Sequence, residues 1–125
     1  MPRRNLEERN IEFRATPGGV LERAVTLADG RAYAHRCSKE VIEAVAGHLD
    51  EHQREGVGIQ SLADEIDAPM TQVNVALQLL DERGLLERDH RLAHVAPGYA
   101  GGFYEHAMTE FYAIIEGHPP EFRDG

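Results

Sequence analysis

The sequence predicts an α+β fold for this chain of 125 residues, a length typical of one domain. Two patterns indicate this class. Before residue 36, apolar and polar residues alternate with the period of a β-strand, and from residue 38 onward apolar residues recur with the period of an α-helix. We therefore expect a small N-terminal β-meander, a mainly helical domain and an added C-terminal helix.

Residues 1–10 are charged and nearly lack apolar anchors, so we predict that they form a flexible arm. Apolar and polar residues then alternate from residue 11 to residue 15, which indicates a strand. The triplet Pro17-Gly18-Gly19 closes this strand, because glycine readily adopts the positive φ that a tight turn needs.

Residues 20–28 are ambiguous, since their apolar residues fit both a helical stripe and one face of a strand. We favour a strand because Asp29-Gly30 follows directly, and this dipeptide between two alternating segments is a strong hairpin signal. Residues 31–35 supply the second alternating segment. The β-meander is therefore expected to span residues 11–36 and to pack on the rest of the domain.

From Ser38 the apolar spacing becomes helical, and three helices are expected. Ser38 is a suitable cap for the first helix, and Ser61 with Asp64 has the spacing of a capping box for a short second helix. Pro69 fits just inside the start of the third helix, which Gly84 ends. The apolar faces of the first and third helices consist of Val41, Ile42, Val45, Leu49, Val73, Ala76, Leu77 and Leu80.

Two short segments, residues 85–88 and 91–95, flank Asp89-His90 and are expected to form a β-hairpin, so the helical domain spans residues 38–97. Over residues 38–95 the chain resembles the winged helix-turn-helix superfamily. The resemblance is most specific in the run SLADEIDAPMTQVNVALQLLDERGLLERD, which matches the short second helix, the tight turn, the third helix and the first wing strand. The alternative is an unrelated three-helix bundle, which the hairpin disfavours.

In DNA-binding members of this superfamily the third helix lies in the major groove, and its outer face contacts bases and phosphates. Amide side chains suit adenine edges, and arginines on the wing suit flanking phosphates. The nucleic-acid-binding residues that the resemblance implies are Thr71, Gln72, Asn74, Gln78, Arg88 and Arg91. The expected partner is double-stranded DNA, and the expected function is transcriptional regulation by a dimer.

Two features of the sequence argue against this function. The formal net charge is −9, and an acidic surface repels the phosphate backbone. Val75 and Leu79 form an apolar pair on the outer face of the third helix, which predicts that protein covers this face, either the β-meander or a second subunit. The alternative function is therefore a protein-protein interaction module that keeps the winged-helix scaffold and does not bind DNA.

Residues 99–117 are predicted to contain a C-terminal dimerisation helix. Its apolar and aromatic residues fill two neighbouring stripes, more than one packing face needs, and helices appended after the wing commonly pair two subunits in this superfamily. The alternative is that the helix folds back on the first helix and completes the core. The predicted homodimer interface contains Phe103, Tyr104, Ala107, Met108, Phe111, Tyr112 and Ile115.

The sequence predicts no catalytic residue, cofactor or enzyme activity. His48 and His52 belong to an H-x-x-E-H pattern found in one class of zinc peptidases, but those enzymes need a larger fold and a third ligand far downstream. We therefore predict no metal site. The single cysteine, Cys37, excludes an internal disulfide, and no apolar run is long enough to cross a bilayer. The start of the chain lacks the pattern of a signal peptide, so a cytoplasmic location is expected.

Overall fold

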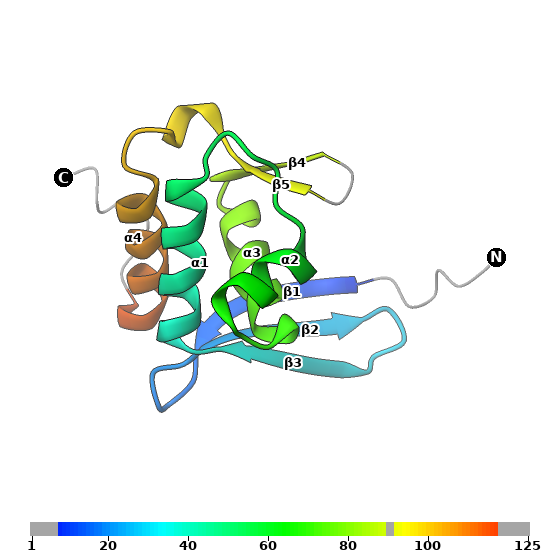
Figure 1. The fold of residues 1–125 in the computed structure, drawn as a ribbon. Helices are drawn as coiled ribbons and strands as arrows, with labels where there is room; N and C mark the ends of the chain where they lie inside the picture. The colour runs from blue at the N-terminus through cyan, green and yellow to red at the C-terminus, as the bar shows by residue number, and fades with distance from the viewer. Residues whose placement is uncertain (1–7, 90–91, 118–125) are drawn as a thin grey trace.

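The computed structural model describes residues 8–89 and 92–117, and this part of the chain has the predicted α+β class (Figure 1). A three-stranded antiparallel sheet comes first, followed by three helices, a two-stranded hairpin and a last helix. The elements are β1 Glu8–Ala15, β2 Leu21–Leu27, β3 Ala32–Cys37, α1 Lys39–Glu51, α2 Ile59–Ile66, α3 Met70–Glu82, β4 Leu86–Asp89, β5 Leu92–Val95 and α4 Phe103–Glu116. None of the described helices is long and apolar enough to span a membrane.

The N-terminal sheet has the strand order β1-β2-β3, so the ambiguous segment at residues 20–28 contains the central strand. The predicted hairpin turn joins β2 to β3. Gly30 adopts a φ of +92° there, a backbone conformation that residues with a side chain rarely adopt. Asp29 Oδ1 accepts a hydrogen bond of 3.0 Å from the Arg31 N–H, which further holds the turn.

Strand β1 begins earlier than predicted. Glu8 pairs with Leu27 and Asn10 with Thr26, so these residues extend the sheet instead of belonging to a flexible arm. Pairing of backbone groups with β2 explains the difference, because it does not depend on the apolar side chains that the segment lacks. Residues 1–7, the rest of the predicted arm, lie outside the described residues.

The two faces of this sheet differ in chemistry. One face packs against α3 and contributes the buried side chains of Leu21 and Val25. On the other face the Glu22 carboxylate accepts hydrogen bonds from Arg14 Nε at 2.9 Å and from Arg36 Nε at 3.1 Å. These hydrogen bonds, that from Arg14 first, hold the pKa of Glu22 below its ordinary value.

The first two helices illustrate a correct and an incorrect cap prediction. Ser38 caps α1 as predicted, because its Oγ accepts a backbone N–H at 3.3 Å. Helix α2 begins earlier than the predicted capping box, with Gly58 as its cap and Ser61 inside the helix. The cause is a tertiary contact: Val57 pairs with Ala93 of β5 through N–H···O bonds of 3.0 and 2.8 Å, which brings the chain to the helix start at Gly58.

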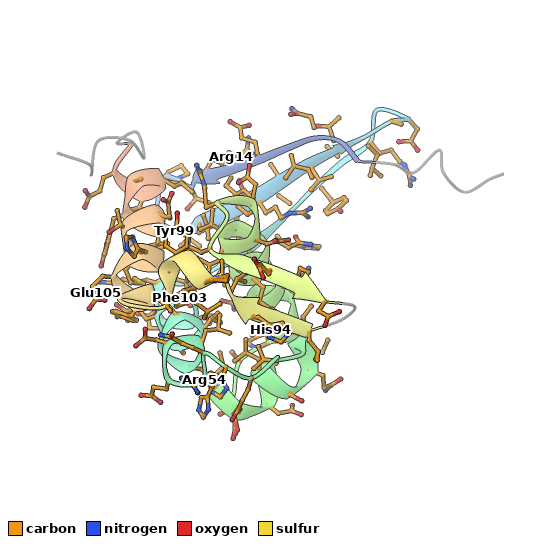
Figure 2. All side chains as sticks on the ribbon, turned by 90° about the horizontal axis from the view of Figure 1, so that it is seen from above. Arg14, Arg54, His94, Tyr99, Phe103 and Glu105 are labelled. Carbon is orange, nitrogen blue, oxygen red and sulfur yellow. The ribbon has the colours of Figure 1, made fainter. Side chains whose placement is uncertain are left out.

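Helix α3 lies between the N-terminal sheet and the pair α1 and α2 (Figure 2). Its predicted core residues Val73, Leu77 and Leu80 are completely buried. Gly84, with a φ of +83°, follows the helix and leads into the hairpin β4–β5, which has the predicted antiparallel pairing. Helix α4 lies alongside α1 and also contacts β1 (Figure 1), so one core extends from the sheet through α3 to α4.

Candidate functional site

The outer face of α3 is the candidate site that the superfamily resemblance implies, and in this chain the N-terminal sheet covers it. Val75 and Leu79 have exposed fractions of only 1% and 0%, and both belong to the hydrophobic core. Strand β3 packs directly against this helix. The sequence allowed two covers for this face, the β-meander or a second subunit. In the structure the chain's own β-meander covers it.

The N-terminal half of α3 carries three of the residues predicted to bind nucleic acid. Thr71 is exposed and Asn74 is partly exposed. Gln72 is engaged inside the chain, because its Oε1 accepts a hydrogen bond of 2.9 Å from the Ser38 N–H, just after β3. This bond fixes the junction of the sheet and α1 against α3, so Gln72 has a structural partner where a base contact was expected.

The other three predicted residues lie apart from these. Gln78 lies beside the sheet, and its Oε1 is buried without a hydrogen-bond partner among the described residues. On the hairpin, Arg88 is exposed and its Nε lies 3.8 Å from Asp81 Oδ2 of α3. Arg91 falls outside the described residues. The described residues among the six predicted to bind nucleic acid do not form one open surface. The N-terminal sheet covers the part of α3 that lies between them.

A hollow of about 290 Å³ opens between the sheet and the C-terminal half of α3. Its lining consists of Ile11, Phe13, Arg23, Gln78, Asp81 and Glu82. The sequence did not predict this hollow. The alternation of Ile11 and Phe13 with polar residues indicated an apolar strand face, but no local pattern showed that this face meets the acidic end of α3.

The seven residues of α4 predicted at a homodimer interface fall into two groups that differ in exposure. Those buried in the single chain, at most 7% exposed, are Phe103, Ala107, Met108 and Phe111. They complete the core because α4 folds back alongside α1, which is the alternative that the sequence left open. The partly exposed residues are Tyr104, Tyr112 and Ile115, named here the α4 stripe.

A positive charge lies at one end of the α4 stripe. Lys39 Nζ of α1 is 5.6 Å from the centroid of the Tyr112 ring, within the range of a cation–π contact. The proximity of the Tyr112 hydroxyl, and after it of the Glu43 carboxylate, raises the pKa of Lys39 above its ordinary value. The stripe therefore places aromatic surface beside a cation that also lies 3.8 Å from Glu43 Oε2.

The histidines of the H-x-x-E-H pattern lie at the end of α1. The rings of His48 and His52 stack with centroids 4.3 Å apart, and His52 Nδ1 is 3.6 Å from Glu55 Oε1. Near them, the His94 ring of β5 (Figure 2) approaches Gly56 so closely that a Cβ there would lie 2.9 Å from it. Among the described residues, no group of three or more His, Cys, Asp or Glu side chains is arranged to hold a metal ion.

Charge is distributed unevenly between the sheet and the helical part. Residues 39–117 contain 15 Asp and Glu against 5 Lys and Arg, whereas residues 8–38 contain 4 against 5. The sheet that covers α3 is therefore close to neutral, and the helical part is strongly acidic.

A comparison of the chain with protein-family models, curated proteins and solved structures finds no match.

Proposed function

We propose that this chain is a protein-protein interaction module on a winged-helix scaffold, with a second copy of the chain as its partner. The observation that carries the proposal is the partial exposure of the α4 stripe, and the burial of Val75 and Leu79 inside the chain argues against DNA binding. In the winged-helix superfamily this helix face reads DNA, and here it binds the chain's own sheet. The element order α1-α2-α3-β4-β5 supports the scaffold assignment.

The surface that we assign to the second copy is the α4 stripe. Tyrosine side chains suit an interface, because the ring is apolar while the hydroxyl keeps a hydrogen-bond partner at the wet edge. A stripe along a helix can pair with its own copy about a two-fold axis, so each residue contributes to the interface twice. Tyr104 and Ile115 lie near opposite ends of α4, so the stripe runs along most of the helix.

Salt dependence distinguishes this function from DNA binding. Each chain has a formal charge of −9, so two copies repel each other, and salt screens this repulsion over a Debye length of about 10 Å at 0.1 M. We expect self-association, measured by sedimentation velocity, to strengthen as salt rises from about 50 to about 500 mM. Binding to a phosphate backbone weakens steeply over the same range.

A matched pair of variants tests the assigned surface. Ile115→Ser removes apolar area from the α4 stripe and is expected to shift the protein toward the monomer. Met70→Ser makes a similar change at the start of α3, where Met70 is 45% exposed, and is expected to leave the association constant unchanged. A chain that stays monomeric at roughly millimolar concentration in high salt contradicts the proposal.

DNA binding is the second candidate function. It is favoured by the exposure of Thr71 and the partial exposure of Asn74 at the start of α3, and by the position of Arg88 on the hairpin. Fluorescence anisotropy of a labelled random-sequence duplex tests it. Binding at low salt that weakens with added salt and with Arg88→Ala favours this candidate; an unchanged anisotropy at about 50 mM salt rejects it.

A further inference from the structure

Charges of opposite sign lie near the two ends of the α4 stripe. Helices α1 and α4 lie side by side and run in opposite directions, so the start of one is next to the end of the other (Figure 1). Lys39 Nζ, at the start of α1, is 5.6 Å from the centroid of the Tyr112 ring. Near the end of α1, Asp50 Oδ1 accepts a hydrogen bond of 3.3 Å from the Tyr104 N–H. An ammonium therefore lies beside one tyrosine of the stripe, and a carboxylate beside the other.

Lys39 and Asp50 also share one side of α1. They are eleven positions apart, which is about three turns of an α-helix, so the two side chains leave the helix in nearly the same direction and about 16 Å apart. Tyr104 and Tyr112 are eight positions apart, which is about two turns of α4. The two helices therefore form one surface, which has a lysine and a tyrosine at one end and an aspartate and a tyrosine at the other.

Both charged groups have room for a further partner. Lys39 Nζ lies 3.8 Å from Glu43 Oε2, which is beyond hydrogen-bond length, and the Lys39 side chain is 48% exposed. Asp50 Oδ1 accepts hydrogen bonds from the Tyr104 N–H and from Gln53 Nε2, whereas Oδ2 accepts none from the described residues. Asp50 is partly exposed. An ammonium from another copy can therefore donate to Oδ2 without displacing either bond.

We propose that two copies associate through this surface with their α4 helices antiparallel, so that Lys39 of each copy pairs with the partner's Asp50. A two-fold axis perpendicular to the helices produces this arrangement and also sets Tyr104 opposite the partner's Tyr112. Each association then brings unlike charges together twice. The inference rests on the proposed self-association, to which it adds the orientation of the two copies and the residues that determine it.

The same two charges disfavour the parallel orientation. A two-fold axis along the helices would bring both copies of Lys39 to one end of the interface and both copies of Asp50 to the other. Like charges at one end repel each other, because the Debye length is about 10 Å at 0.1 M salt. Since each chain has a formal charge of −9, the two Lys39–Asp50 pairs contribute attraction that the parallel orientation lacks.

Zero-length cross-linking of the full chain tests the orientation. Lys39 is the only lysine in the sequence, and a carbodiimide joins an amine to a carboxylate in direct contact with it. Within one copy about 16 Å of helix separates Lys39 from Asp50, so a link between them must join two copies. We expect mass spectrometry of the digested covalent dimer to show this link. The link from Lys39 to Glu43 within one copy is the internal control for the reaction, because these side chains are 3.8 Å apart.

Charge reversal measures the contribution of the pair at one fixed salt concentration. Lys39→Glu and Asp50→Lys are each expected to weaken self-association at least about ten-fold in sedimentation velocity, because each sets like charges opposite each other twice. Both changes in one chain restore unlike pairs, so association should return to within about three-fold of wild type. Glu65→Lys, at an exposed position of α2, changes the net charge by as much as Asp50→Lys and should not weaken association.

Asp50→Lys also removes the acceptor of the Tyr104 N–H, so thermal unfolding must show that this variant folds. If it does not, Asp50→Asn takes its place, because the amide keeps an acceptor oxygen and removes only the charge. Asp50→Asn is expected to weaken association about three-fold.

Two results overturn the inference and leave the proposed self-association standing. The first is a wild-type dimer in sedimentation velocity whose cross-links do not join Lys39 to Asp50. The second is a wild-type dimer that neither single charge reversal weakens, or that the double variant fails to restore. A wild-type chain that stays monomeric contradicts the proposed function itself, and the inference with it.

Discussion

Helices α3 and α4 each carry a second apolar stripe beside the one that faces the core, and the two stripes have different surroundings. Val75 and Leu79 of α3 lie under the N-terminal sheet, whereas the α4 stripe stays partly exposed. Strand β3 packs against α3 and ends at the completely buried Cys37, whereas the sheet contacts α4 through β1 and β2. A second stripe therefore indicates a covered surface, but tertiary structure decides whether the cover comes from the same chain.

The largest effect is expected from Leu79→Ala, because Leu79 is completely buried between α3 and the sheet. The free energy of unfolding should fall by about 2–5 kcal/mol, the usual cost of a large cavity. Leu77→Ala, at the conventional core stripe of the same helix, should cost a similar amount in urea unfolding. A loss below about 1 kcal/mol at Leu79 would contradict its burial under the sheet.

Cys37 reports whether the sheet stays on α3. Burial raises the pKa of the Cys37 thiol to about 12, so at pH 8 the side chain is protonated as well as shielded. Labelling by an aromatic disulfide reagent should be at least about 100-fold slower in native protein than in urea. Leu79→Ala should speed native labelling, because it weakens the contact between the sheet and α3, which then opens more often. Ile115→Ala should leave the labelling rate unchanged. Rapid native labelling of the wild type would show that the sheet does not stay packed on α3.

Within α4, a smaller effect is expected at the exposed stripe than at the buried one. Ile115→Ala should lower the free energy of unfolding of the monomer by less than about 1.5 kcal/mol, because Ile115 is only partly buried. Phe111→Ala, at a position that is 1% exposed, should cost about 3–5 kcal/mol. Both are measured by guanidinium unfolding at low protein concentration. Equal costs would mean that the α4 stripe belongs to the core.

The smallest effect is expected on the outer face of the sheet. Arg14 and Arg36 lower the pKa of Glu22, so this carboxylate stabilises the fold above the ordinary glutamate pKa near 4.5, and its contribution disappears as the pH falls below the lowered folded value. The difference in free energy of unfolding between wild type and Glu22→Gln should therefore be larger at pH 7 than at pH 3. Both arginines are largely exposed, which keeps the difference small. A difference independent of pH would exclude this role for Glu22.

Most helices and strands could be predicted from the sequence because their signals are local. The hairpin at Asp29-Gly30, the cap at Ser38 and the helix stop at Gly84 each depend on residues a few positions apart. The predictions that failed depended on distant contacts. The capping box at Ser61 was wrong because Val57 pairs with Ala93, thirty-six positions further along the chain.

The candidate site was less predictable than the fold. The sequence indicated that protein covers the outer face of α3, and it could not distinguish the β-meander from a second subunit. It implied a base contact for Gln72, which instead accepts a hydrogen bond from Ser38, thirty-four positions away. The hollow lined by Gln78 had no signal in the sequence, since its walls come from β1, β2 and α3.

By itself, the sequence determined the α+β class, the order of the strands and helices, and the presence of extra apolar stripes on α3 and α4. Periodicity, caps and turn residues encode these features within short segments. Only the tertiary structure decided that the sheet lies on α3 and that the buried residues of α4 complete the core. It also decided that a hollow remains between the sheet and α3. Such features arise where segments far apart in the chain meet, and the energy of that contact depends on the shapes of both surfaces together.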